Sequence, residues 1–263
     1  MRRIALIAFF LSVVLPFAAA DEWNKTYTVS ARPDVRISSS DAALRVSAWD
    51  QNTVRVRVYT EGYKIGDGGI RIIEHQTGNV VEVEVKYPHE HGLSFSWHNK
   101  QVEVDVQMPR EGNAALHTGD GSIRLSGIHG DMELDTGDGS VEATDVEGQL
   151  KARSGDGHVT VVGRFTALDL NTGDGRIDAT VQPASKPAKD WSIHTGDGSV
   201  TLRVPENLAV DLDIHTSDGH INSDVPITTS GRLGENSLRG KMNGGGPVIT
   251  VRTGDGSIHL ERS

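Results

Sequence analysis

Seven aspartates recur in one short sequence context, and their carboxylates are the first candidates for chemistry. Five lie in Thr-Gly-Asp-Gly, one in Ser-Gly-Asp-Gly and one in Thr-Ser-Asp-Gly. They are Asp120, Asp138, Asp156, Asp174, Asp197, Asp218 and Asp255. A single such carboxylate could serve as a catalytic acid, and a stacked series could bind Ca²⁺.

The spacing of these aspartates favours architecture over catalysis. The first four lie 18 residues apart, and insertions lengthen the later intervals. Because the seven aspartates occupy equivalent positions, no single aspartate is distinguished as a catalytic residue. We therefore expect a column of structural turn residues. In each turn the two glycines that flank the aspartate would adopt positive φ, and the carboxylate, such as that of Asp120, would accept a hydrogen bond from a nearby backbone N–H. Calcium binding between stacked carboxylates is the alternative.

Apolar side chains alternate with polar ones on both sides of each turn. The position three residues after each aspartate is always Ile or Val, and the position four residues before it is Leu, Ile, Val or Ala. This period of two predicts half-buried strands, and no segment after residue 20 has a convincing helical period. Thr118 and its equivalents share the inward parity of Leu116, so we expect an inner ladder of hydroxyl groups.

The repeats predict an all-β fold, a single-stranded β-solenoid whose coils have about 18 residues and stack at about 4.8 Å. A β-sandwich of hairpins that turn at Asp-Gly is the alternative. We expect divergent coils over residues 21–110 and the regular solenoid over residues 111–263. Residues 182–190 and 223–247 are predicted insertions. The coil that ends at Leu260 is expected to close the stack without a cap, which leaves an edge for self-association.

The first 20 residues have the pattern of a signal peptide. Arg2 and Arg3 precede an apolar run, and Ala18, Ala19 and Ala20 supply small residues for cleavage. An uncleaved membrane anchor is the alternative, and we expect no membrane span in the rest of the chain. The sequence thus predicts an exported protein that is either periplasmic or extracellular and associated with the cell surface.

Two sets of polar residues are candidates for binding. The residues that directly precede the Thr column vary in chemistry and predict a solvated face or a polar binding strip. This strip consists of His117, Asp135, Arg153, Asn171, His194, His215 and Arg252. His89 and His91, with His98 nearby, could bind a transition metal, but Pro88 and Gly92 suggest a loop of surface histidines, and we expect neither a metal nor another cofactor.

Composition excludes several classes of partner. The formal net charge is −10, and no basic stripe with interleaved aromatics is present, which argues against nucleic acid. Aromatic residues make up 5% of the chain and cysteine is absent, so neither a large aromatic pocket nor a disulfide framework is expected.

The repeated Thr-Gly-Asp-Gly-Ser-Ile/Val corners, followed by GKMNGGGPVITVRTGDGSIHL, resemble the bacterial β-strand-repeat "putative adhesin" family, a domain of unknown function. The resemblance covers residues 116–260, and we expect it to extend back to Val35. It implies an extracytoplasmic β-solenoid with no established catalytic residues.

These patterns together predict a non-catalytic, exported module of the cell envelope that binds or scaffolds in the manner of an adhesin. Its partner would be an envelope glycan, a protein or another copy of the chain. A carbohydrate-active enzyme (a polysaccharide lyase or hydrolase on a β-helix) is the first alternative, and it requires one convergent carboxylate cluster in a groove. A calcium-stabilised structural module is the second.

Overall fold

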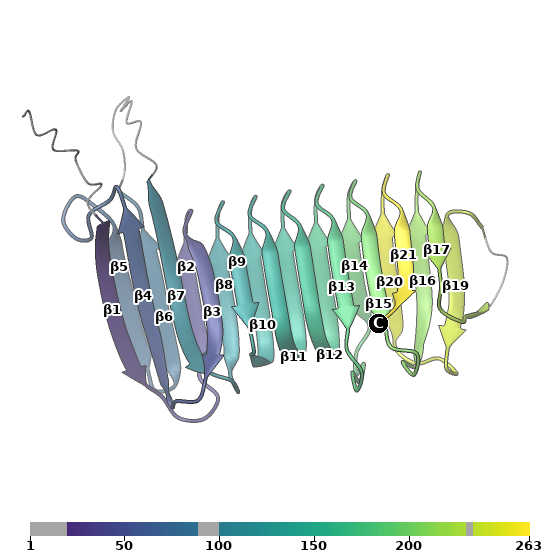
Figure 1. The fold of residues 1–263 in the computed structure, drawn as a ribbon, viewed down its shortest axis with the longest axis horizontal. Helices are drawn as coiled ribbons and strands as arrows, with labels where there is room; N and C mark the ends of the chain where they lie inside the picture. The colour runs from purple at the N-terminus through teal and green to yellow at the C-terminus, as the bar shows by residue number, and fades with distance from the viewer. Residues whose placement is uncertain (1–19, 89–99, 230–233) are drawn as a thin grey trace, which may run out of the picture.

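The computed structural model describes residues 20–88, 100–229 and 234–263, which form strands and no helix (Figure 1). No helix in these ranges is long and apolar enough to cross a membrane. The predicted signal segment falls almost wholly in residues 1–19 and therefore lies outside the described residues. All-β architecture, which the period-two pattern predicts, is confirmed.

Each corner separates two strands that pair with neighbouring repeats rather than with each other. Leu116 in β8 (Asn113–Thr118) is in register with Leu134 in β10 (His129–Thr136), and both strands run parallel. Beyond the corner, Ile123 in β9 (Ile123–Ser126) is likewise in parallel register with Val141. These pairings contradict the β-sandwich of hairpins, because a hairpin would join the two strands that flank a corner.

The strands form two layers that run along the whole molecule. Layer 1 contains, in spatial order, β5 (Arg71–Thr77), β6 (Val80–Lys86), β2 (Asp34–Ser39), β8, β10, the second halves of β11 (Val141–Ser154) and β12 (Val159–Thr172), β14 (Trp191–Thr195), β20 (Val248–Thr253), β16 (Val210–Thr216), β19 (Ser237–Met242) and β18 (Thr228–Thr229). Layer 2 contains β1 (Ala20–Thr28), β4 (Thr53–Glu61), β7 (Gln101–Pro109), β3 (Ala43–Trp49), β9, the first halves of β11 and β12, β13 (Ile177–Val181), β15 (Val200–Val204), β21 (Ile258–Arg262) and β17 (Ile221–Ser223). Because β11 and β12 run from one layer into the other, the two layers belong to one continuous, solenoid-like sheet.

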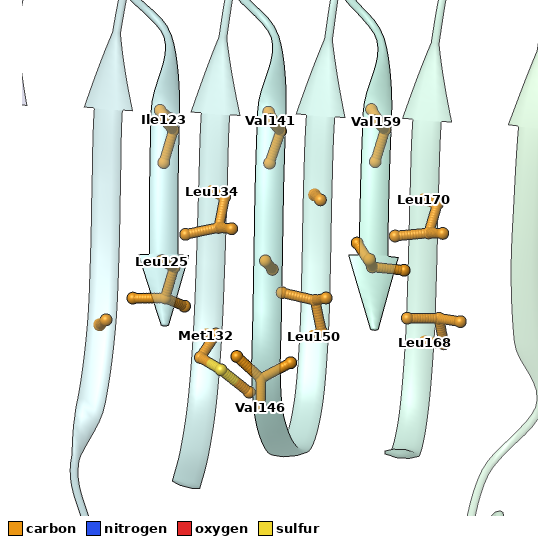
Figure 2. Packing of buried hydrophobic residues seen from close by; sticks show 14 of the residues in the cluster. Ile123, Leu125, Met132, Leu134, Val141, Val146, Leu150, Val159, Leu168 and Leu170 are labelled. Carbon is orange, nitrogen blue, oxygen red and sulfur yellow. The ribbon is translucent and has the colours of Figure 1, made fainter. Parts of the chain in front are cut away.

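The core is a narrow space filled by aliphatic side chains from both layers (Figure 2). Leu134 and Leu170 from layer 1 and Ile123 and Val141 from layer 2 are all at most 1% exposed. Aliphatic side chains recur at equivalent positions in each step of the stack, so each repeat buries the apolar face of the next. This packing explains why a chain with few aromatics forms a continuous core.

The C-terminal coil lies inside the stack rather than at its end. In layer 1, β20 pairs with β14 on one side and with β16 on the other. In layer 2, β21 lies in the same way between β15 and β17. The expectation that the coil ending at Leu260 forms an open edge is therefore wrong, because β16 and β17, which precede it in sequence, lie beyond it in space.

Antiparallel strands occupy both ends of the stack. At one end β19 runs antiparallel to β16, and the two-residue β18 pairs with β19, so strands form within the predicted insertion 223–247. At the other end, β1 and β5 are joined by side chains: Glu74 accepts hydrogen bonds from Lys25 and Tyr27, and Gln76 donates to the carbonyl of Thr28 at 2.8 Å. Short strands and charged edge residues of this kind limit pairing with other chains.

Candidate functional surface

The seven aspartates lie in one column along the corner edge, and every one of them is exposed. The structure adds Asp41, whose carboxylate lies beside the corner at Gly119 just as that of Asp120 lies beside Gly137. Burial raises the pKa of Asp41, and the negative charge of Asp120 raises it further. Within the described ranges, none of the seven repeat carboxylates accepts a hydrogen bond, and no group of three or more His, Asp or Glu side chains is placed to hold a metal ion.

The corner glycines are required by close approach and not by positive φ. Neither Gly137 nor Gly139 lies in the left-handed region, which corrects the expectation from sequence. A Cβ atom at Gly139 would instead lie 2.0 Å from the carbonyl oxygen of Gly121 in the preceding corner. The same approach, at 1.9 to 2.0 Å, recurs at the other second glycines. Only glycine therefore allows the corners to stack.

The threonines, not the aspartates, fasten each corner. The buried Thr136 hydroxyl donates to the carbonyl of Gly121 in the preceding corner at 2.8 Å, and it accepts from the Gly139 N–H at 3.2 Å. Ser154 makes the equivalent bonds one repeat later. The hydroxyls thus bond to glycine backbone groups rather than to one another, which replaces both the predicted hydroxyl ladder and the predicted turn-capping by aspartate.

Replacing Thr136 with Val is expected to destabilise the protein. The substitution keeps the side-chain shape but leaves the Gly121 carbonyl and the Gly139 N–H without this partner, at a cost of about 1–3 kcal/mol. Thermal unfolding should show a midpoint lower by roughly 2–12 °C for a domain of this size. Thr136→Ser is the control, because Ser154 already occupies the equivalent position, and its midpoint should stay near that of the wild type. Equal losses in the two variants would contradict this role of the hydroxyl.

The polar strip predicted from sequence forms a single row on the outer face of layer 1. Register joins His117 to Asp135, Asp135 to Arg153, and Arg153 to Asn171. The row then continues through His194, Arg252 and His215, so the last two exchange their sequence order in space. His117 remains 63% exposed although its Nδ1 lies 3.7 Å from Asp135. The candidate metal ligands His89, His91 and His98 lie outside the described residues.

Two adjoining grooves lie on the outer face of layer 1, beside the part of this row that runs from His117 to Asn171. A groove of 480 Å³ contains His117 and Asp135 and is bounded by β5, where Ile73 is 46% exposed. A second groove of 680 Å³ extends along the same layer to Lys151 and Asp169. The small side chain of Ala115 lines both. Sequence reasoning missed these grooves because they join strands that are far apart in the chain.

Two carboxylates in these grooves, Glu133 and Glu74, have lowered pKa values. A hydrogen bond from Lys151, together with its charge, lowers the pKa of Glu133. For Glu74, burial raises the pKa, but hydrogen bonds from Lys25 and Tyr27 and the charge of Lys25 outweigh it, so the net shift is downward. A general acid needs the opposite shift, toward neutral pH.

A third groove, of 680 Å³, lies on the outer face of layer 2 and differs in charge. It is lined by four arginines and three acidic side chains, together with hydroxyl and amide groups. The arginines are Arg45, Arg55, Arg57 and Arg124. Arg57 contacts Glu22 at 2.9 Å, whereas Arg55 has no ion-pair partner among the described residues. The two outer faces thus present different charge patterns.

Three comparisons relate the chain to known proteins. Similar solved structures include a "putative cell adhesion protein" from Clostridium sporogenes ATCC 15579, 14% identical, with a TM-score of 0.40 and 93% of this chain and 100% of that chain covered. They also include a "putative adhesin" from Bacteroides fragilis NCTC 9343, which is 11% identical with a TM-score of 0.44. A "putative lipid binding protein" from Parabacteroides distasonis ATCC 8503 is 12% identical, also with a TM-score of 0.44. Each of these two alignments covers 91% of this chain and 96% of the other chain. No curated protein matches the chain.

The family comparison covers nearly the whole chain. The model of the Toastrack DUF4097 family matches residues 24–261, which include the N-terminal strands, all seven corners and the C-terminal coil. The chain therefore belongs to the Toastrack DUF4097 family.

Proposed function

We propose that the protein is a non-catalytic module of the cell envelope that binds a glycan or a protein on the outer face of layer 1. On this proposal the stack is a single-stranded β-solenoid, exported by the predicted signal segment. The observation that carries the proposal is the outward row from His117 to His215, whose first members His117 and Asp135 line one of two adjoining grooves.

The chemistry of this face suits recognition of an extended polar ligand. Hydrogen-bonding side chains repeat at each strand, about 4.8 Å apart, so a long ligand can contact several of them in succession. Rigid strands hold these groups in place before binding, which reduces the entropy lost on association. The binding free energies of weak contacts at successive strands then add up along the ligand.

The carbohydrate-active enzyme has less support. A glycosidase-type reaction needs one carboxyl group with a raised pKa beside a second carboxylate. The pKa values of Glu74 and Glu133 are lowered, by hydrogen bonds from Lys25 and Tyr27 and from Lys151 respectively. These side chains are suited to holding charge for binding rather than to donating a proton.

Binding to envelope material tests the proposal. The purified protein is expected to co-sediment saturably with isolated envelope fractions or to bind members of a panel of envelope glycans. Substituting His117, Arg153 and His194 with alanine removes three exposed side chains of the row. This strip variant is expected to bind at least about tenfold more weakly, which corresponds to a loss of about 1.4 kcal/mol or more.

A matched variant on the other layer controls for nonspecific effects. Thr160, Asp178 and Thr201 form a corresponding row on the outer face of layer 2, and their triple alanine variant should bind like the wild type. Absence of binding to every envelope fraction and glycan would overturn the proposal. Equal loss of binding in both variants would also contradict the assignment to layer 1.

A further inference from the structure

Along two outward rows of each layer, the outer faces carry charge patterns that are complementary at four of six strands when one face is shifted by one strand. Face 1 comprises two outward rows over six consecutive strands of layer 1: Glu82 and Glu84 on β6, Arg36 and Ser38 on β2, Ala115 and His117 on β8, Glu133 and Asp135 on β10, Lys151 and Arg153 on β11, and Asp169 and Asn171 on β12. Face 2 comprises two outward rows over six consecutive strands of layer 2: Arg55 and Arg57 on β4, Asp105 and Gln107 on β7, Arg45 and Ser47 on β3, Arg124 and Ser126 on β9, Glu142 and Thr144 on β11, and Thr160 and Val162 on β12.

The signs along the two faces match as complements. From β6 to β12, face 1 is negative, positive, neutral, negative, positive and negative. From β4 to β12, face 2 is positive, negative, positive, positive, negative and neutral. If the first strand of one face meets the first strand of the other, four of the six strand pairs join opposite charges and none joins like charges. Because the strands of both faces have the same spacing, all six strands of face 1 stay aligned with the six strands of face 2.

This match requires a specific register between copies. Within one molecule, β6 and β7 belong to the same repeat, since both pair with the repeat formed by β2 and β3. If face 1 of one copy met face 2 of a second copy with equivalent repeats aligned, Glu82 would face Asp105 and Arg36 would face Arg45. Both of these pairs have like charges and would repel. A shift of one strand spacing, about 4.8 Å, brings Glu82 to Arg55 and Arg36 to Asp105 instead.

We propose that face 1 of one copy docks on face 2 of a second copy, displaced by one strand. The partner is a second copy of this chain because the complementary pattern lies on the chain's own opposite side. Ion pairs within each face, such as Glu82–Arg36 at 3.0 Å and Arg124–Glu142 at 3.3 Å, are exposed. Such pairs contribute little free energy, so they can exchange for contacts between copies.

When two copies associate in this way, one copy keeps a free face 2 and the other keeps a free face 1. Further copies can therefore add at both ends, so the assembly is an open stack rather than a closed dimer. Six strands cover roughly 600 Å² per partner, at the low end for specific interfaces, and we expect association in about the micromolar range. This inference goes beyond the proposed envelope binding and does not rest on it. Because His117, Asp135 and Arg153 lie on face 1, a docked copy and an envelope ligand would compete for that face.

Sedimentation velocity of the purified protein over a range of concentrations tests the proposal. At about 0.1 M salt the mean sedimentation coefficient should rise with concentration, and at about 1 M salt, where charges are screened beyond about 3 Å, it should fall to that of a monomer. A coefficient that does not change with concentration at low salt would overturn the proposal.

Charge reversal tests which faces meet. Glu82→Arg with Glu84→Arg makes β6 positive, and Arg55→Glu with Arg57→Glu makes β4 negative. Each variant alone should sediment as a monomer, because like charges then face each other. An equimolar mixture should associate, since the positive β6 of the first variant meets the negative β4 of the second, and the reverse contact keeps native charges.

Two controls keep the result interpretable. Thermal melts show whether each reversal variant is folded, and the variant with all four substitutions in one chain should associate again. Asp138→Arg with Asp156→Arg reverses two charges on the corner edge and should leave association unchanged. Failure of the mixture of folded variants to associate, or equal loss of association in the corner variant, would overturn the proposed contact.

Discussion

Deleting residues 248–263 is expected to unfold strands β16 to β19 at the end of the stack. The deletion removes β20 and β21, which separate the repeat of β14 and β15 from that of β16 and β17. It also removes four buried aliphatic side chains, each worth about 1.5–3 kcal/mol on burial. These are Ile249, Val251, Ile258 and Leu260. Their sum is comparable with the whole stability of a typical domain, about 5–15 kcal/mol.

Hydrogen exchange measures this effect directly. Amides in β16 and β19 should lose protection in the deletion variant, whereas those in β8 to β10 should keep more of it, since those strands retain both neighbours. Deleting only residues 261–263 is the control, because it removes surface ion pairs such as Arg203–Glu261 and leaves Leu260 in place. Native protection of β16 after the longer deletion would contradict the account, since the repeat of β16 would then pair with β14 directly.

Replacing Gly139 with Ala is expected to cost about 3 kcal/mol or more, because the new Cβ overlaps the backbone of the preceding corner and no flexible side chain can give way. For a domain of this size, that loss lowers the melting midpoint by roughly 6–12 °C. Asn tolerates positive φ and would be milder than Ala if conformation were the reason for glycine. On the close-approach account, Gly139→Asn should be at least as damaging as Gly139→Ala.

Gly234 supplies a matched control for this prediction. A Cβ at Gly234 would meet its nearest atom at 3.7 Å, an ordinary contact, so Gly234→Ala should change stability by no more than about 0.5 kcal/mol. Equal melting midpoints for Gly139→Ala and Gly234→Ala would show that the corners can separate without cost.

The sequence predicts the local elements well because each repeat carries its own signals. The alternation around Leu116 and Ile123 identifies the inward side chains, and both are at most 1% exposed. The period of 18 residues corresponds to the observed register of Met132 with Leu150. Even the irregular Ser-Ser-Asp at Asp41 lies beside the corner of Asp120.

The order of the repeats in space is not encoded in any local pattern. The edges of the repeats are chemically similar, so nothing near Val248 shows that β20 inserts between β14 and β16. For the same reason the sequence does not reveal that Arg252 lies between His194 and His215. The reason for the corner glycines is also nonlocal, since the carbonyl oxygen that excludes a Cβ at Gly139 belongs to Gly121, in another repeat.

The central claim is that the corner aspartates maintain shape at most, while the outer face of layer 1 binds. Envelope binding by two triple variants, measured side by side, tests it most directly. One carries Asp120→Asn, Asp138→Asn and Asp156→Asn, and the other is the strip variant at His117, Arg153 and His194. The account predicts wild-type binding for the corner variant and at least about tenfold weaker binding for the strip variant. Loss of binding in a folded corner variant, with binding retained in the strip variant, would contradict it and make the aspartate column the binding site.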